Sequence, residues 1–128
     1  MKFKWEDYLH LAENLCEQGT EAHYRAAISR AYYAVFNILK LKADYKKSGG
    51  SFHQDFINYL KNPDDELIYK LNISLTDLGI IAYNLGVLRE DRNNADYSLL
   101  PPRFDKVKTL QSIEKAQNIL QICKEAEV

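Results

Sequence analysis

A long helical pattern covers residues 21–45, which read EAHYRAAISRAYYAVFNILKLKADY. Apolar side chains recur there every three or four residues, a spacing typical of a helix face packed on a core. That face consists of Tyr24, Ile28, Ala31, Val35, Ile38 and Leu39. A rotation of about 100° per residue places Arg30, Tyr33 and Asn37 on the opposite face. The segment is therefore predicted to be a long central helix with a polar stripe.

Shorter helical patterns flank this segment, and no segment alternates in the way that a strand requires. They predict helices over about residues 4–17, 52–60 and 63–92, and a last helix from about residue 103. Ser51 with Gln54 predicts a capping box, and Asn62-Pro63 a second helix start. Residues 93–102, ending in Pro101-Pro102, are expected to form a loop. The expected fold is all-α, an up-and-down bundle of four to five helices in a single domain over residues 1–128.

The helix expected over residues 63–92 is apolar on two sides. One stripe consists of Leu67, Leu71, Leu75, Leu78, Ala82 and Leu85, and the other of Tyr69, Ile73, Ile80 and Val87. A helix apolar on two sides is buried on two sides, so it lies within the bundle or between two subunits. Gly79 and Gly86 cost helix stability, which predicts that another backbone packs closely there. We expect a two-fold homodimer, with the location of its interface left open.

The composition is that of an ordinary globular protein, with 46% hydrophobic and 27% charged residues. The net charge of −1 provides no overall basic field to attract nucleic acid. No window approaches the roughly 18 apolar residues of a membrane helix, and the N-terminal pattern is not that of a signal peptide. We therefore expect a cytoplasmic protein without membrane contact. Cys16, Cys123 and the three histidines lack ligand spacing, so neither a metal nor another cofactor is expected.

Two segments carry a more specific pattern. Residues 24–36 contain Ser-Arg-Ala-Tyr-Tyr-Ala-Val-Phe, and residues 88–97 read LREDRNNADY. With Phe52-His53-Gln54 between them, they resemble the HEPN family, the higher eukaryotes and prokaryotes nucleotide-binding domains. The branch is the one with Ser-Arg-x-Tyr-Tyr and Arg-x-x-Arg-x-x-Ala-Asp-Tyr motifs. The resemblance covers most of the chain and implies a helical bundle that commonly forms a two-fold dimer.

Active members of that family are metal-independent ribonucleases, often the toxins of toxin–antitoxin pairs. Their site combines an arginine, a polar neighbour and a histidine a few residues later. The histidine moves protons while the arginine holds the phosphate. By this resemblance, Arg92 matches the arginine and Asn93 its polar neighbour, but Tyr97 stands nearest to the position of the histidine. A tyrosine hydroxyl is a poor general base at neutral pH, so the ribonuclease motif is predicted to be degenerate.

The two motifs are expected to meet in space. In an antiparallel bundle, the polar face of the helix over residues 21–45 can approach the inward side of the end of the helix over residues 63–92. The expected site is one polar cleft that contains Arg30, Tyr33, Arg89, Arg92, Asn93, Asp96 and Tyr97. Three arginines in one place would attract an anion such as a phosphate or a partner's carboxylate.

Structural alternatives exist for the same residues. Arg92 and Asp96 could form a clamp that closes the loop after the helix. Arg30, Tyr33 and Asn37 could form a polar network between helices. His53 either substitutes for the missing histidine or is a surface or capping residue.

Three functions follow from these interpretations. The first is a non-catalytic interaction domain that works with a partner such as a nucleotidyltransferase-type antitoxin, an idea that comes from the resemblance alone. The second is an active, RNA-cleaving toxin that uses Arg92 with Tyr97 or His53. The third is a nucleotide- or RNA-binding module without cleavage. The missing histidine favours the first and third functions, and the near-neutral charge favours the first over the third.

Overall fold

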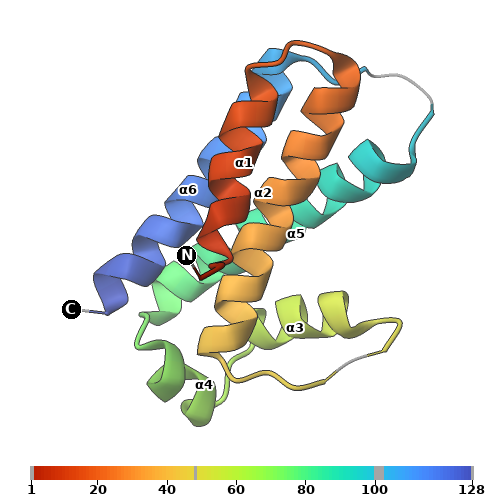
Figure 1. Cartoon of the computed structure of the whole chain (residues 1–128). Helices are drawn as coiled ribbons and strands as arrows, with labels where there is room; N and C mark the ends of the chain where they lie inside the picture. The colour runs from red at the N-terminus through yellow and green to blue at the C-terminus, as the bar shows by residue number, and fades with distance from the viewer. Residues whose placement is uncertain (1, 48, 100–102, 128) are drawn as a thin grey trace.

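The computed structural model describes residues 2–47, 49–99 and 103–127 and shows six helices, with no strand in these ranges (Figure 1). In chain order they are α1 (Glu6–Cys16), α2 (Glu21–Lys42), α3 (Phe52–Lys61), α4 (Asp65–Leu71), α5 (Leu75–Tyr97) and α6 (Lys106–Ala126). The all-α prediction is confirmed. The expected count of four to five helices is too low.

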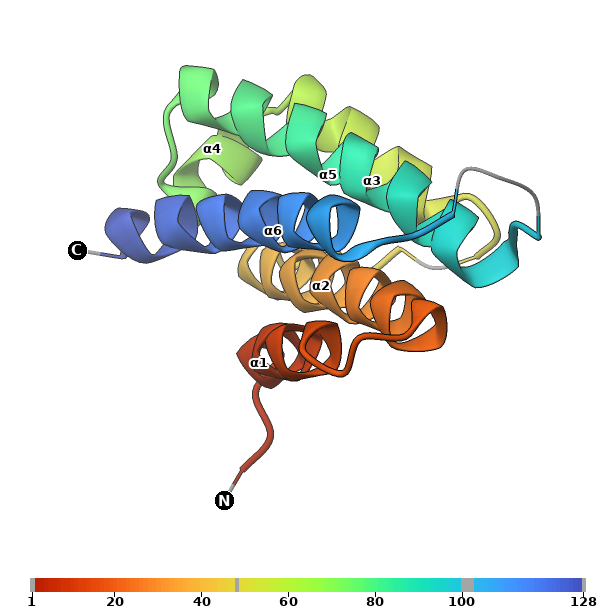
Figure 2. The same ribbon diagram turned by 90° about the horizontal axis from the view of Figure 1, so that it is seen from above.

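The helices pack around α2. It contacts α1, α5 and α6, while α3 packs against the side of α5 (Figure 2). The polar face of α2 is therefore placed near the helix that carries the second motif. The largest fully buried side chains include Tyr32 and Phe36 of α2 and Phe56 of α3. Burial of an aromatic or aliphatic side chain of this size contributes about 1.5–3 kcal/mol to stability.

Four helices begin at a side chain that satisfies a free backbone donor. In each case the oxygen accepts a hydrogen bond from the N–H three residues later, as preferred N-cap residues do. These residues are Thr20, Asp64, Ser74 and Asp105. Two expectations need correction here. The Ser51 hydroxyl makes no cap and donates to Asp55 instead. Asp64, rather than Asn62, caps the helix that follows Pro63.

The expected helix over residues 63–92 is in fact two helices. Asn72 adopts a left-handed conformation with φ 54° and ends α4, and the axes of α4 and α5 differ by 87°. Asparagine tolerates this region better than most residues. The continuous stripe from Tyr69 to Val87 therefore does not exist. Tyr69 is 86% exposed on α4, whereas Ile73 is buried in the corner between the helices.

The ends of three other helices differ from expectation. α2 stops at Lys42, short of Tyr45, because Asp44 takes a left-handed φ of 53°. α5 continues through the expected loop as far as Tyr97, while Pro101 and Pro102 lie outside the described residues. α6 begins at Lys106 instead of near Arg103. Its buried face includes Thr109 and Ser112, whereas the apolar side chains of Val107 and Leu110 are exposed.

The glycines of α5 do not serve close packing within the described chain. A Cβ atom built on Gly79 or Gly86 meets nothing within 4 Å. The expectation of a closely packed backbone is therefore wrong for the described parts of the subunit. Within those parts, no single helix is long and apolar enough to cross a membrane, although the bent pair of α4 and α5 together meets the criterion of length and composition.

Candidate functional site

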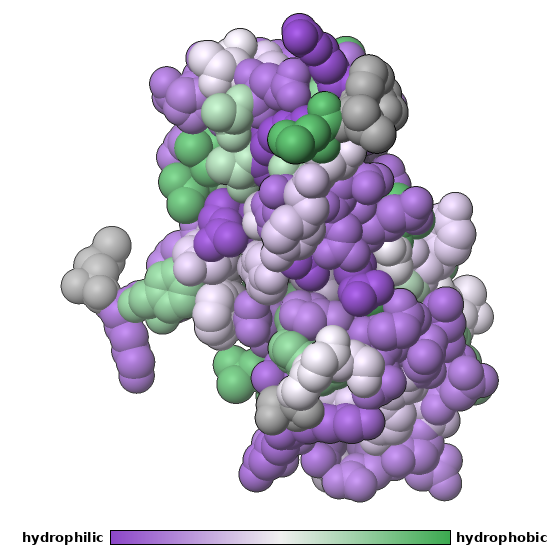
Figure 3. All heavy atoms as spheres, turned by 90° about the vertical axis from the view of Figure 1, so that its right-hand side faces the viewer, coloured by the Kyte–Doolittle hydropathy of each residue, from purple (hydrophilic) through white to green (hydrophobic). Residues whose placement is uncertain are grey.

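Three arginines gather where α2, α3 and the C-terminal half of α5 meet. We call Arg30, Arg89 and Arg92 the arginine cluster. Figure 3 shows the side of the molecule that carries α3 and the end of α5, where hydrophilic side chains predominate and hydrophobic ones form small separate patches. The cluster exists because α2 and α5 contact each other and α3 covers α5.

Arg92 is the most buried member of the arginine cluster. It is 7% exposed, and its guanidinium carbon lies 5.3 Å from the centroid of the Tyr32 ring and 5.2 Å from that of Tyr33. A guanidinium over aromatic faces gains cation–π attraction, which is stronger where water is excluded. One turn later, the Asp96 carboxylate lies 3.9 Å from Arg92 Nη1. Arg92 is therefore fixed by two rings and one weak ion pair.

Arg30, which lies on α2, contacts the same Tyr33 ring as Arg92. Its guanidinium carbon lies 5.4 Å from the Tyr33 centroid and 4.8 Å from that of Tyr8 on α1. Arg30 Nη2 donates to Ser29 Oγ at 3.3 Å, and Ser29 Oγ donates to Asp96 Oδ2 at 3.3 Å. Asp96 thus links both arginines through one carboxylate.

Arg89 completes the cluster from α5 toward α3. Its Nη1 donates to Gln54 Oε1 at 3.2 Å. The Nε atoms of Arg89 and Arg92 are buried and have no hydrogen-bond partner among the described residues. A buried donor without a partner is costly, so such an atom calls for an explanation such as a water or a ligand.

The arginine cluster carries more positive than negative charge. In the described ranges, Asp96 is the one carboxylate within ion-pair distance of its guanidinium groups. Asp91, one residue before Arg92, accepts a hydrogen bond from Ser112 of α6 at 3.1 Å and so faces another helix. One carboxylate cannot neutralise three guanidinium groups, and the excess charge attracts an anion.

His53 of α3 lies beside the cluster. Its Nδ1 is 2.7 Å from the Tyr32 hydroxyl, and its ring lies 4.2 Å from the rings of Phe36 and Phe52. Burial, followed by the charges of Arg92, Arg89 and Lys40, lowers the pKa of His53 to about 4. The imidazole is therefore neutral at pH 7. Burial also raises the pKa of Tyr32, although Arg92 opposes this effect.

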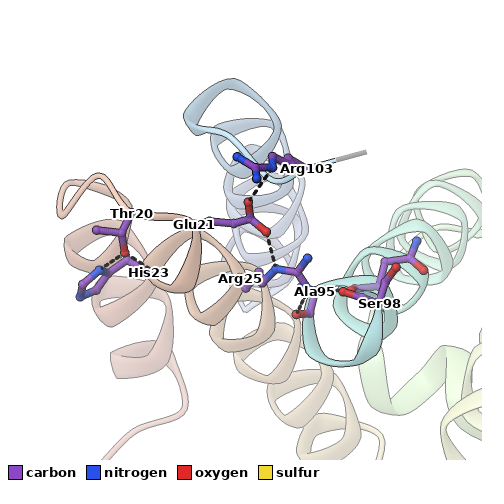
Figure 4. Close-up of polar contacts among 8 residues, drawn as sticks. Thr20, Glu21, His23, Arg25, Ala95, Ser98 and Arg103 are labelled. Carbon is purple, nitrogen blue, oxygen red and sulfur yellow. Dashed lines mark hydrogen bonds and ion pairs between the residues drawn. The ribbon is translucent and has the colours of Figure 1, made fainter. Parts of the chain in front are cut away.

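A fourth arginine, Arg25, holds the end of α5, and the sequence patterns did not reveal it (Figure 4). Its Nη1 donates to the carbonyl oxygens of Ala95 at 3.0 Å and Ser98 at 2.6 Å, and more weakly to that of Asn94 at 3.4 Å. Its Nε donates to Glu21 at 3.0 Å. The spacing from Glu21 to Arg25 indicates a pair on one helix, but no local pattern shows which other helix end Arg25 meets.

A family model described as the HEPN domain matches residues 4–126. The chain belongs to the HEPN family. A search of curated proteins and a search of solved structures each found no match. In this HEPN domain the two segments that carry the resemblance form parts of α2 and α5, and they supply all three members of the arginine cluster.

Two residues of the expected cleft lie apart from the arginine cluster of the HEPN domain. Tyr97 is 75% exposed, and Asn93 is partly exposed. Neither side chain makes a hydrogen bond or ion pair with the cluster in the described part of the chain. The structure brings together Arg30, Tyr33, Arg89, Arg92 and Asp96, with His53 beside them. Among the described residues, no group of three histidine, cysteine or acidic side chains could hold a metal ion.

Proposed function

We propose that this HEPN domain binds a phosphate-bearing ligand, an RNA or a nucleotide, at the arginine cluster and does not cleave it. The observation that carries the proposal is the imbalance of charge. Three guanidinium groups face one carboxylate, and two of their Nε donors are buried without partners in the described ranges. A phosphate supplies the missing negative charge, and its oxygens accept hydrogen bonds from the N–H groups that the cluster exposes.

The members of the cluster have different roles in this proposal. Arg30 and Arg89 are partly exposed and present N–H groups to an incoming phosphate. Arg92 is held between two tyrosines, so it contributes a fixed positive charge behind them. A preorganised guanidinium loses little conformational entropy when a ligand arrives.

Cleavage needs a group that removes a proton and a group that returns one. His53 has a pKa of about 4, so at pH 7 it is a weak base, and the imidazolium that would protonate a leaving group is scarcely populated. Tyr97, which stands nearest to the position where active family members have histidine, is directed to solvent. We therefore expect little or no RNA turnover.

A second candidate function is a ribonuclease that uses His53 with Arg92. The position of His53 favours it, because the imidazole is hydrogen-bonded to Tyr32, whose ring faces Arg92. In this mechanism the neutral imidazole would accept the proton of a 2′-hydroxyl, whose oxygen attacks the phosphorus, and Arg92 would stabilise the charge on the phosphate. The bond from phosphorus to the 5′-oxygen would break, and the 5′-oxygen would take its proton from water.

One experiment separates these functions. A fluorescent RNA oligonucleotide is titrated with the protein in a buffer that contains a metal chelator. The integrity of the RNA is followed over hours. Arg89→Gln should weaken binding about tenfold. Arg103→Gln, which removes the same charge from an 89% exposed side chain, should leave it unchanged. Equal loss in both variants, or no binding at all, rejects the proposal. Metal-independent cleavage that disappears in His53→Gln establishes the ribonuclease instead.

We also propose that the domain forms a two-fold homodimer through the exposed face of α5. Leu75, Ile80 and Tyr83 are 64%, 46% and 70% exposed on this face, and Gly79 and Gly86 offer room for a second helix. Exposed aromatic and aliphatic side chains around small residues are typical of an interface core. Tyr83→Arg should convert a dimer to a monomer in light scattering, and a monomeric unmutated protein at micromolar concentration rejects the dimer.

The family resemblance adds a further partner to this proposal. A nucleotidyltransferase-type antitoxin would pair with the domain in a toxin–antitoxin system. Co-expression of the domain with such a protein, followed by size-exclusion chromatography, tests for a stable complex.

A further inference from the structure

Carbonyl groups at the end of α5 accept hydrogen bonds from a side chain of another helix. A helix leaves its final carbonyl oxygens without intrahelical donors, and basic side chains in the last turn commonly supply them. The last turn of α5 contains no basic residue. Arg25, about 70 positions earlier in the chain, donates from α2 to the carbonyls of Ala95 and Ser98, and weakly to that of Asn94, which also accepts the Ser98 N–H.

Arg25 is itself held in one orientation. Glu21 accepts from its Nε at 3.0 Å, and its guanidinium carbon lies 4.7 Å from the Phe104 ring. The side chain is 22% exposed. An arginine bound on several sides donates in fixed directions, so Arg25 joins α2 to the end of α5 in one geometry.

The turn held by Arg25 also carries Asp96, the carboxylate of the arginine cluster. We infer that Arg25 is a positioning residue for the cluster: it keeps the last turn of α5 helical and thereby holds the Asp96 carboxylate beside Arg92. This inference deepens the proposed function and rests on it where phosphate binding is the readout. Arg25 contacts the backbone on either side of Asp96, at Ala95 and Ser98, and does not touch the carboxylate.

The geometry predicts whether loss of Arg25 strengthens or weakens phosphate binding. Arg92 lies one turn before Asp96 and is held by Tyr32 and Tyr33, so unwinding of the last turn leaves Arg92 in place. The same unwinding removes the carboxylate that competes with a ligand for Arg92. Loss of Arg25 is therefore expected to strengthen phosphate binding, in the same direction as Asp96→Asn.

The test compares Arg25→Gln with a matched control. Arg103→Gln removes the same charge, and Arg103 also approaches Glu21, at 3.8 Å, without contacting the carbonyls of α5 (Figure 4). Asp96→Asn and the double variant Arg25→Gln/Asp96→Asn complete a cycle. Three quantities are measured: hydrogen exchange of the Asp96, Tyr97 and Ser98 amides, the NMR resonance of the Arg92 Nε–H, and the affinity for inorganic phosphate and the RNA oligonucleotide.

In Arg25→Gln, exchange of these amides should accelerate about tenfold or more, whereas the Arg103→Gln control should match the unmutated protein. The Arg92 Nε–H resonance should shift in the same direction in Arg25→Gln and Asp96→Asn. Phosphate affinity should rise about threefold in each, with no further rise in the double variant. Arg25→Lys retains the charge but not the planar donors and should give intermediate exchange rates, which provides a second variant if Arg25→Gln does not fold.

Unchanged exchange in Arg25→Gln overturns the inference. Faster exchange with lower phosphate affinity also overturns it, because Arg25 would then be a purely structural contact. If the unmutated protein binds neither phosphate nor RNA, the proposed function fails on its own. The exchange rates and the Arg92 resonance then still decide whether Arg25 holds Asp96 in place.

Discussion

Arg25 and Arg92 both lie at the contact between α2 and α5, yet their surroundings differ. The guanidinium of Arg25 has a carboxylate, three carbonyl oxygens and an aromatic ring around it. That of Arg92 has two aromatic rings, a carboxylate at 3.9 Å and a buried Nε that lacks a partner in the described residues. The difference indicates that Arg25 is satisfied by the fold itself, whereas Arg92 and its neighbours are not.

The same substitution at both sites tests this comparison most directly. Arg25→Met removes several charge-assisted hydrogen bonds and should lower the free energy of unfolding by about 2–3 kcal/mol. Arg92→Met replaces an under-paired buried charge with an apolar side chain of similar length and should change it by less than about 1 kcal/mol. Urea denaturation followed by circular dichroism measures both. Equal losses would remove the distinction between the two arginines.

For ligand binding, Arg92→Met should have the larger effect of the two substitutions. Arg92→Met takes a positive charge from behind the phosphate site and should weaken RNA binding about tenfold or more. Arg25→Met keeps all three arginines of the cluster and releases Asp96 as Arg25→Gln does, so it should strengthen binding about threefold instead of weakening it. Fluorescence anisotropy at fixed ionic strength gives both affinities. If binding weakens in Arg25→Met and not in Arg92→Met, the ligand binds near Arg25 and the proposed site at the arginine cluster is wrong.

Burial of His53, together with the surplus charge near Arg92, also gives the stability a pH dependence. The pKa of His53 is about 4 in the fold, below its ordinary value of about 6.5, so protonation favours the unfolded chain. This contribution to stability is complete above pH 6.5 and is lost as the pH falls toward 4. The urea midpoint should fall more between pH 7 and pH 5 in the unmutated protein than in His53→Gln. The exposed His10 is the control, and His10→Gln should behave like the unmutated protein.

The smallest expected effect extends the comparison to the opposite face of α5. Gly79→Ala should raise the unfolding free energy of the monomer by about 0.5–1 kcal/mol, because alanine favours the helix and its Cβ meets nothing within 4 Å. If a second subunit packs there, the same change should weaken dimerisation. Thermal melts at two protein concentrations distinguish these results. A loss of stability that does not depend on concentration contradicts both.

Most of the helical architecture could be predicted because periodicity is a local signal. The long helix α2, its buried stripe and the all-α class follow from the spacing of apolar residues. The corner at Asn72 was missed for the same reason, because the apolar spacing continues across it. Ser74 followed by Asp77 is a helix start signal, and it lies inside what appeared as one continuous stripe.

The site was less predictable than the fold. The motifs single out Arg30, Arg89 and Arg92, but the partners of these residues depend on how the helices pack. The sequence does not show that Arg25 reaches carbonyls about 70 residues away, nor that Tyr32 meets His53. The direction of Tyr97 depended on whether α5 continued past Asn93. A loop would have let the tyrosine turn inward, whereas the helix directs it to solvent.

The corner at Asn72 also determines where the domain can be attached to a surface or a dye. The side-chain amide of Asn72 donates to the carbonyl of Ala126 at 2.9 Å, so the end of α6 is held beside the start of α5. At about 1.5 Å per residue, Arg92 lies roughly 25 Å farther along α5. This separation exceeds the screening length of about 8 Å at physiological salt. A charged label joined after α6 should therefore add little of its own field to the arginine cluster.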